Sequence, residues 1–351
     1  MVIGGGMAGA SVAYELAATR SVVLLEAEPE LARHSTSRSA ATYIPGHGPG
    51  PVRTLIAASG PRFAALVAEL DAPPLLRPRP VLHVAVDAAG EAELAAQLAE
   101  QAGEPGAPVP LDPAAAQRRC PALAPGVVRA AAVVEGAADI EAETLHQAYV
   151  RGLRRRGGTV RTGARVAAVE RAGTGWRVHT ADGAGPVDAA DVVDAAGAWA
   201  DVVAGRAGVP CIGLTPYRRT IAVVRVPDPA RLRAPDGPLP MVLEARERFY
   251  FKAEGDGLLV SPADETRVAP HDARPGELDV AAGLERVEAV TGLGLRSVRT
   301  SWAGLRSSCP TGGGGGGVAG APRVLVLRRS GRCRDRDGTG AGGVRGGRRD
   351  R

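Results

Sequence analysis

Glycines near the start of the chain have the spacing of a phosphate-binding turn. Residues 4–9 read Gly-Gly-Gly-Met-Ala-Gly, a G-x-G-x-x-G pattern that follows a short apolar stretch. Gly4 permits a tight turn, Gly6 lets the backbone approach a pyrophosphate, and Gly9 lets a helix pack closely on a strand. The N–H groups and positive dipole end of a helix N-terminus attract the same anion. The pattern predicts a dinucleotide site, with an ordinary glycine turn as the alternative.

An acidic residue completes this pattern. An Ala-rich helix is expected from the turn to about Ala18, and residues 21–25 are typical of a second buried strand that ends in Glu26. In dinucleotide-binding folds an acid about twenty residues after the glycines hydrogen-bonds a ribose hydroxyl. A strand, turn, helix, strand and acid in register are more specific than the glycines alone.

A second glycine turn occurs later in the chain. Residues 187–194 predict a parallel-type strand, which breaks at Ala195-Ala196-Gly197-Ala198-Trp199 and leads into a helix. Neighbouring parallel strands share their carboxyl edge, so this turn can lie beside the first one. We expect it to contact the same ligand; a purely structural turn is the alternative.

The elements that must position these turns alternate along the chain. Helical periodicity appears over residues 51–70, 91–101, 141–156 and 280–290, and strand patterns over 81–86, 159–161, 165–170, 176–180, 217–226, 248–252, 258–261 and 297–305. Residues 103–124 are rich in Pro and Gly and suggest a connection. The alternation predicts an α/β protein with a Rossmann-like domain and an interleaved α+β domain containing a mixed sheet. This pattern suits flavin and nicotinamide enzymes alike.

Composition limits the class of protein. With 351 residues, of which 45% are hydrophobic and 3% aromatic, the chain can form two domains with cores built mainly from Ala, Val and Leu. Its four cysteines have no paired or metal-type spacing, so we expect no metal and a reducing, cytoplasmic environment. No apolar run reaches the length of about twenty residues that a spanning helix needs.

The basic charge is concentrated at the C-terminus. Residues 323–351 contain ten Arg and three Asp, whereas the whole chain carries only +5, so residues 1–322 carry −2. The globular part therefore gives no electrostatic indication of a nucleic-acid partner.

Five segments together resemble the FAD-dependent D-amino-acid oxidase/dehydrogenase superfamily, which includes glycine and sarcosine oxidases. They are residues 2–10, Glu26, the loop 34–41 (His-Ser-Thr-Ser-Arg-Ser-Ala-Ala), residues 195–199, and residues 302–306 (Trp-Ala-Gly-Leu-Arg). They occur in the order expected for the family, and the resemblance extends over residues 2–306. It implies an FAD cofactor.

The resemblance also implies which residues hold FAD. The first turn would face the diphosphate, Glu26 the ribose, the loop 34–41 the flavin, and the backbone of Val166 the adenine. The implied cofactor residues are Gly4, Gly6, Met7, Ala8, Gly9, Glu26, His34, Ser37, Arg38, Ser39, Val166, Ala196, Gly197 and Trp199. A cation such as Arg38 near the flavin pyrimidine would stabilise the reduced ring; an ordinary surface charge is its alternative.

The implied chemistry is oxidation of an amino acid or secondary amine. Hydride leaves the carbon next to the amine for flavin N5, and the imine hydrolyses to an oxo acid and ammonia or an amine. Arg306 is the expected carboxylate clamp, because a guanidinium binds two oxygens with one planar fork. Tyr250 is a candidate hydrogen-bond donor, and His47, with Tyr43, a candidate pocket residue. The alternatives are an ordinary ion pair, core packing and loop positions.

The electron acceptor is expected to be oxygen or a quinone or other electron-transfer partner. Some family members that use oxygen place a Lys near flavin N5. The comparable strand here reads Gly257-Leu258-Leu259, which favours a dehydrogenase.

The expected domain boundaries follow from these matches. Residues 1–55 and 125–210 form the FAD-binding domain, 56–124 a substrate or cap segment, 211–298 the substrate domain, and 299–306 a strand returning to the FAD-binding domain. Residues 307–351, rich in Gly and Arg, predict a disordered tail.

The tail itself has two interpretations. It could be a basic appendage that binds single-stranded nucleic acid. Alternatively, it results from a reading-frame error, because residues 331–340 permit codons that, shifted by one base, encode Ala-Gly-Ala-Gly-Ile-Glu-Thr-Ala-Pro, similar to a flavin turn and helix start. We favour the frameshift, which leaves open whether the chain as written retains FAD and activity. The alternative functions are an NAD(P)-dependent dehydrogenase and a nonenzymatic product with a nucleic-acid-binding tail.

Overall fold

The computed structural model describes residues 1–309 and 325–327. In this part of the chain the α-helices are α1 (Met7–Leu16), α2 (Gly50–Leu70), α3 (Ala88–Glu100), α4 (Pro113–Arg119), α5 (Ala142–Arg155), α6 (Ala200–Arg206) and α7 (Glu277–Thr291), with short 3-10 turns η1 (Gly197–Trp199) and η2 (Pro229–Leu232). The strands form one parallel-type sheet, one large mixed sheet and two small three-stranded sheets. The predicted α/β class with a mixed sheet is confirmed.

The first sheet has the order β20-β13-β1-β2-β9. Its strands are β1 (Val2–Ile3), β2 (Val23–Leu25), β9 (Thr159–Arg161), β13 (Val192–Asp194) and β20 (Leu325–Leu327). The pairs β13-β1, β1-β2 and β2-β9 are parallel, and β20 joins β13 antiparallel. Because β1 lies between β2 and β13, the turn that follows β1 is next to the turn that follows β13.

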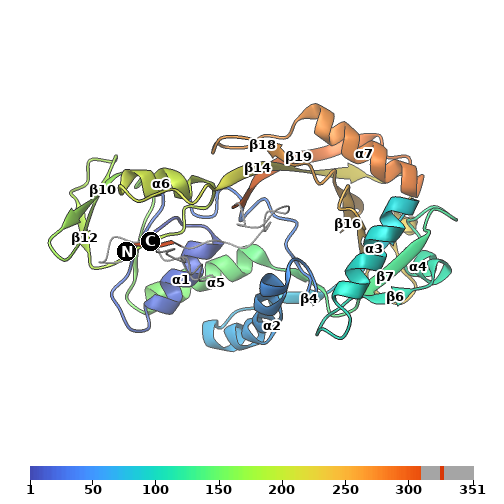
Figure 1. The fold of residues 1–351 in the computed structure, drawn as a ribbon, viewed down its shortest axis with the longest axis horizontal. Helices are drawn as coiled ribbons and strands as arrows, with labels where there is room; N and C mark the ends of the chain where they lie inside the picture. Colours follow the sequence, from blue (N-terminus) through green and yellow to red (C-terminus); the bar gives the residue numbers. More distant parts are fainter. Residues whose placement is uncertain (310–324, 328–351) are drawn as a thin grey trace, which may run out of the picture.

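Side chains of this sheet point alternately to its two faces, and both faces are buried. Val2, Leu24 and Val193 pack against α1, whereas Ile3, Leu25 and Val192 pack against α6 and the antiparallel strands β10–β12. Those strands are β10 (Val166–Ala172), β11 (Gly175–Thr180) and β12 (Val187–Ala189). Helix α5 lies alongside α1, as the ribbon shows (Figure 1). Both faces of the sheet are covered, as parallel sheets require.

The large sheet has the order β18-β14-β17-β16-β15-β5-β7-β6, and β19 pairs with β14. Its strands are β5 (Val81–Ala85), β6 (Val109–Leu111), β7 (Ala130–Val134), β14 (Thr215–Arg225), β15 (Met241–Glu244), β16 (Tyr250–Glu254), β17 (Gly257–Ser261), β18 (Thr266–Arg267) and β19 (Ser297–Ser308). One face forms the largest hydrophobic core with residues of α4 and α7. The opposite face carries the polar residues described below.

Several boundaries differ from those expected. The segment 103–124 is not merely a connection, since it contains β6 and α4. Residues 130–140 were expected in the FAD-binding domain, but β7 pairs in the large sheet, and β8 (Ala138–Ile140) pairs with β3 (Thr42–Tyr43) and β4 (Leu76–Pro78). The strand expected to return the chain at 299–306 is part of β19, which pairs with β14. Backbone pairing to the first sheet comes instead from β20.

The predicted tail falls largely outside the described residues. Ser307 and Ser308 end β19, Cys309 is buried, and residues 325–327 form β20. Ser307 and Ser308 thus belong to the large sheet and residues 325–327 to the first sheet, and the rest of the predicted tail after Cys309 lies outside the described residues. No helix in residues 1–309 is long and apolar enough to cross a membrane.

Candidate functional site

The turn after β1 can accommodate only glycine at two positions. Gly4 has φ +107°, and a Cβ there would lie 2.4 Å from the carbonyl oxygen of Ala195. A Cβ on Gly9 would lie 1.8 Å from the carbonyl oxygen of Gly4. The first turn, the start of α1 and the turn after β13 therefore touch through their backbones, as predicted from the sequence.

Two side chains organise the backbone N–H groups of this turn. The Glu26 carboxylate accepts hydrogen bonds from the N–H groups of Gly5 at 2.6 Å and Glu28 at 2.8 Å. The Thr36 hydroxyl accepts from the N–H of Met7 at 3.0 Å, at the start of α1. Gly6 is extended and has no side chain that could cap the helix. The remaining N–H groups of the first helical turn are the kind that a phosphate accepts from.

A buried histidine supports the turn from the other side. His146, on α5, is 4% exposed and its Nε2 lies 2.8 Å from the carbonyl oxygen of Gly5. Burial lowers the pKa of this imidazole, although the Gly5 carbonyl and Glu26 favour its charged form. A carbonyl can only accept, so Nε2 is the protonated nitrogen. The sequence analysis missed His146, because its helical periodicity indicates only a core-facing position.

The turn after β13 contains a buried acid. Asp194 is fully buried; its Oδ1 accepts from the Ala196 N–H at 3.0 Å, and its Oδ2 has no hydrogen-bond partner. Burial, with a smaller contribution from Asp201, raises the pKa of Asp194 to about 7. Gly197 follows with φ +55°, a left-handed conformation that glycine adopts easily.

The loop 34–41 packs against β19 of the large sheet. Ser35 Oγ donates to the Leu305 carbonyl at 2.8 Å, and Trp302 Nε1 donates to the Arg38 carbonyl at 3.1 Å. Gly304 lies directly under this loop, since a Cβ there would contact Arg38 and Ser35. The segment 302–306 is thus packed against the loop that the sequence analysis assigned to the flavin.

Arg38 does not present a free guanidinium. It donates to the carbonyls of Ala273 at 2.9 Å and Ala303 at 3.0 Å, and to Asp272 at 2.5 Å. In the described residues its side chain therefore ties the loop to β19 and to the segment before α7. This arrangement differs from the expected cation aimed at a flavin.

The other predicted cofactor residues lie in the same loop, against it or, for Val166, in a core cluster of the first sheet. The rings of His34 and Trp199 are 4.7 Å apart, and His34 Nε2 lies 3.3 Å from Glu28. Ser37 donates to the Arg33 carbonyl, and the Ser39 hydroxyl accepts from the Ala41 N–H. Val166 is distant in sequence but packs on Leu25 and Ile3 in one core cluster, and its carbonyl accepts from Arg206.

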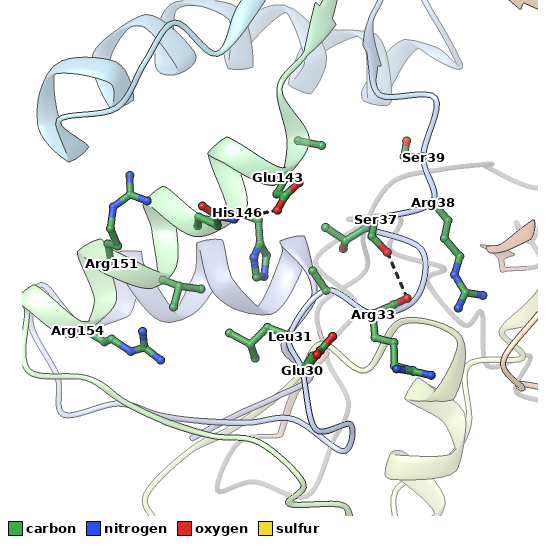
Figure 2. Close-up of a pocket in the computed structure, with 15 residues that line it drawn as sticks. Glu30, Leu31, Arg33, Ser37, Arg38, Ser39, Glu143, His146, Arg151 and Arg154 are labelled. Atoms are coloured by element: carbon green, nitrogen blue, oxygen red, sulfur yellow. Dashed lines mark hydrogen bonds between the residues drawn. The ribbon is translucent and has the colours of Figure 1, made fainter. Parts of the chain in front are cut away.

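A cavity of about 880 Å³ lies between residues 30–39 and helix α5. Figure 2 shows Ser37, Arg38 and Ser39 on its loop side, and His146 between α5 and the loop. Arg151 and Arg154 extend from α5 on the other side. The cavity approaches the first turn through His146, but its lining includes neither Arg306 nor Tyr250 nor His47.

Strand register places the predicted substrate residues on one face of the large sheet. Tyr217 pairs with Arg306 and Arg219 with Gly304, so both arginines project from the same face of β14 and β19. Tyr250 pairs with Ser261 on the adjoining strands β16 and β17. Ile221, Val223 and Leu259 form an apolar patch with Tyr250 and Trp302 on this face, and Ala40 of the loop packs on it.

The side chain of Arg306 makes no hydrogen bond or ion pair with any described residue, whereas its backbone pairs with β14. Burial lowers the pKa of its guanidinium, and the nearby charge of Arg219 lowers it further, while Glu247 and Tyr250 act in the opposite direction. Arg219, in contrast, donates to Glu265 at 3.0 Å and to the Ala263 carbonyl. A partly buried, unpaired guanidinium is costly unless it binds an anion.

The other two predicted substrate residues share this environment. Burial raises the pKa of Tyr250, and Arg219 and Arg306 oppose that shift. His47 Nε2 lies 4.0 Å from Glu247 Oε1. Burial lowers the pKa of His47, Glu247 opposes this shift, and Arg306 and Arg219 add to it. Tyr43, named with His47, instead packs edge-on against Phe63 of α2.

The only lysine of the chain is part of a buried ionic network. Lys252 Nζ donates to Asp139 and to the Ala40 carbonyl, both at 2.8 Å, and Arg79 donates to Asp139 at 2.6 Å. Burial alone would raise the pKa of Asp139, but the hydrogen bonds from Lys252 and Arg79 outweigh it and lower the pKa. The network fixes the end of the loop 34–41. Apart from the rarity of lysine, no feature of the sequence predicts this network.

The chain matches a known protein family over most of its length. A family model described as FAD dependent oxidoreductase (DAO) matches residues 1–332, nearly the whole chain. The match spans the two turns, the loop and the polar sheet face.

Solved structures have the same fold. Glycine oxidase from Geobacillus kaustophilus is 21% identical, with a TM-score of 0.76 over 88% of this chain and 82% of that one. Iminodiacetate oxidase from Chelativorans sp. BNC1 is 23% identical, with a TM-score of 0.71 over 88% and 84%. L-alpha-glycerophosphate oxidase from Mycoplasma pneumoniae, solved with FAD bound, is 18% identical, with a TM-score of 0.71 over 89% and 83%. At these identities the likeness concerns the fold.

Proposed function

Because the chain belongs to the family of FAD-dependent oxidoreductases, we propose that it oxidises the carbon–nitrogen bond of an amino acid or secondary amine. The observation that carries the proposal is the guanidinium of Arg306, which has no hydrogen-bond or ion-pair partner among residues 1–309, on a sheet face that adjoins the loop 34–41. An amino-acid carboxylate supplies the anion that this guanidinium lacks.

The described residues suit an FAD with its diphosphate at the first turn. Only glycine fits at Gly4 and Gly9, and the start of α1 offers backbone N–H groups to a diphosphate. Glu26 accepts one bond from the Gly5 N–H of the turn and one from the Glu28 N–H, and it retains oxygen lone pairs for a ribose hydroxyl. Thr36, absent from the sequence-based set, joins the diphosphate side through its bond to Met7.

Substrate binding is assigned to the polar sheet face. Arg306 binds the carboxylate with two parallel hydrogen bonds, and the Tyr250 hydroxyl donates a third. The apolar patch of Ile221, Val223 and Leu259 excludes water from the same face. When bound, FAD accepts the hydride from the carbon that carries the nitrogen, and the released iminium is hydrolysed by water. The contribution of the protein is to hold that carbon in position.

The acceptor that reoxidises the cofactor is assigned to a class other than oxygen. At the position where oxygen-using members place a Lys, this chain has the apolar segment 257–259, and Leu259 is 4% exposed. Dye-coupled turnover that continues without oxygen supports this assignment, and oxygen consumption at the same rate contradicts it.

The proposed role of Arg306 is tested with Arg306→Met and the control Arg299→Met. Arg299 lies on the same strand but is exposed and paired with Asp256. Loss of charge-assisted hydrogen bonds predicts a 10- to 100-fold lower kcat/KM for Arg306→Met, or about 1.5–3 kcal/mol. Arg299→Met should stay within about twofold.

Stability separates binding from a structural role. A partly buried cation that has no partner among the described residues costs folding energy, so Arg306→Met should be at least as stable as the natural protein to urea. A variant that is less stable and equally active would contradict the proposed clamp.

A further inference from the structure

Two segments that are distant in sequence bring His47 and Glu247 together, within electrostatic range of Arg306. His47 follows β3, and Glu247 lies in the turn between β15 and β16. Each segment has its own buried anchor.

The His47 segment is fixed by a buried arginine. Arg53, 7% exposed, donates to the Gly48 carbonyl at 2.7 Å, to Glu104 at 2.7 and 3.0 Å, and to Glu100 at 3.0 Å. On the other side of His47, a Cβ on Gly46 would lie 2.6 Å from the Gly106 carbonyl oxygen. The backbone is thus held on both sides of His47.

The Glu247 turn is fixed by a buried carboxylate. Glu244 is fully buried and accepts hydrogen bonds from the N–H groups of Arg246 and Arg248 and from the Arg248 guanidinium. Glu247 itself has φ +54°, an unfavourable conformation for a residue with a side chain. Such strained residues persist where the surrounding structure holds them, and they are common at ligand sites.

The gap between the two side chains suits a bound amine. His47 Nε2 and Glu247 Oε1 are 4.0 Å apart, too far for a direct hydrogen bond. A nitrogen about 2.8 Å from each can bridge them.

Burial favours the neutral form of His47. Burial lowers the pKa of His47; Arg306 on β19 and Arg219 on β14 lower it further, and Glu247 alone opposes them. His83 on β5 faces the same pair and is neutral, with a pKa of about 4, mainly because it is buried. A neutral imidazole can accept a proton.

We propose that Glu247 and His47 form the subsite for the substrate's amino group: the Glu247 carboxylate holds the ammonium, and the His47 imidazole accepts its proton. The inference rests on the proposed function, because it presumes a substrate with a carboxylate at Arg306. Arg306 and Glu247 together then match the opposite charges of an amino-acid zwitterion.

The proton transfer is balanced. The N–H bond of the ammonium breaks, its electron pair stays on nitrogen, and the proton binds the imidazole, which becomes cationic beside Glu247. The neutral amine is then the species whose α-carbon can release hydride. The same arrangement disfavours substrates that place a second carboxylate at Glu247.

Two isosteric probes test the subsite. Sarcosine and butyrate have the same shape, but butyrate has a methylene in place of the ammonium group. Equilibrium dialysis of each against the FAD-loaded, dithionite-reduced protein measures binding without turnover. We expect the natural protein to prefer sarcosine, and Glu247→Gln to weaken sarcosine 10- to 100-fold while butyrate binding stays equal or improves. The control Glu254→Gln, exposed on β16, should change neither.

A second variant separates the two roles. His47→Gln should slow anaerobic flavin reduction by sarcosine more than it weakens sarcosine binding, and addition of imidazole should partly restore the rate. A natural protein without preference for sarcosine, or a Glu247→Gln variant that changes both probes equally or neither, overturns the proposal. Arg306→Met should weaken the binding of both sarcosine and butyrate. If it does not, the proposed carboxylate clamp is wrong, but the ratio of the two affinities still tests the proposed amine subsite.

Discussion

The buried carboxyl of Asp194 makes a quantitative prediction about pH. It ends β13 beside Ile3 of β1, its Oδ1 accepts only the Ala196 N–H, and its Oδ2 has no partner. Burial raises its pKa from 3.8 to about 7. The group is therefore protonated in the folded chain over a pH range in which the unfolded chain has already lost that proton.

The size and sign of the effect follow from linkage. A carboxyl whose pKa is raised on folding stabilises the protein fully below pH 3.8, and this stability is lost as the pH rises to about 7. At 1.36 kcal/mol per pKa unit the loss is about 4 kcal/mol. Asp194→Asn does not titrate and should not show it. The amide adds donors without partners, which costs about 1–3 kcal/mol at every pH.

Urea unfolding of both proteins between pH 4 and pH 8 provides the assay. The free energy of unfolding of Asp194→Asn minus that of the natural protein should increase by about 4 kcal/mol over this range. Asp236→Asn, at an exposed position, is the control and should show no such trend. A difference for Asp194→Asn that stays flat from pH 4 to pH 8 would refute the reasoning, because it would mean that burial does not hold the proton.

Two further substitutions test the loop and the first turn. Gly9→Ala should lose FAD affinity at least tenfold, because its Cβ would lie 1.8 Å from the Gly4 carbonyl oxygen. The control Gly205→Ala in α6, whose Cβ would meet no other residue within 4 Å, should be neutral or stabilise the protein by up to about 1 kcal/mol. Flavin fluorescence titration and urea unfolding measure both variants, and equal FAD affinity in the two would contradict this role of Gly9. Lys252→Met should cost about 3 kcal/mol, since it removes one cation from the buried Asp139; thermal unfolding measures this, and an unchanged midpoint would show that Lys252 does not stabilise the loop.

The sequence predicted the elements whose signals are local. The two glycine turns were found because close backbone approach admits glycine alone, and β1 and β13 do adjoin. Arg306 and Tyr250 were identified through a resemblance, and strand register places their side chains on one face. Helix α5 was found from the spacing of Leu145, Tyr149 and Leu153, all of which are buried.

Other features depend on contacts between distant segments and leave no local pattern. Arg38 looks like a free loop cation until Asp272, 234 residues later, is seen to bind it. No local sequence pattern marks Glu247 as a site residue. Its left-handed backbone depends on the buried Glu244, and His47, which it contacts in space, is 200 positions earlier in the sequence. β7 was misplaced because its partner strands β5 and β6 flank the helix α3. Sheet order requires knowledge of these pairings.

The central claim is that this chain oxidises an amine carrying a carboxylate through bound FAD. The most direct measurement mixes the FAD-loaded protein anaerobically with a panel of D-amino acids, L-amino acids and N-methyl amino acids, and follows both flavin absorbance and the organic product. We expect that at least one compound bleaches the flavin and yields one molecule of oxo acid for each flavin reduced. A protein that binds FAD but is bleached by none of them, or bleaches without forming an oxo acid, would contradict it.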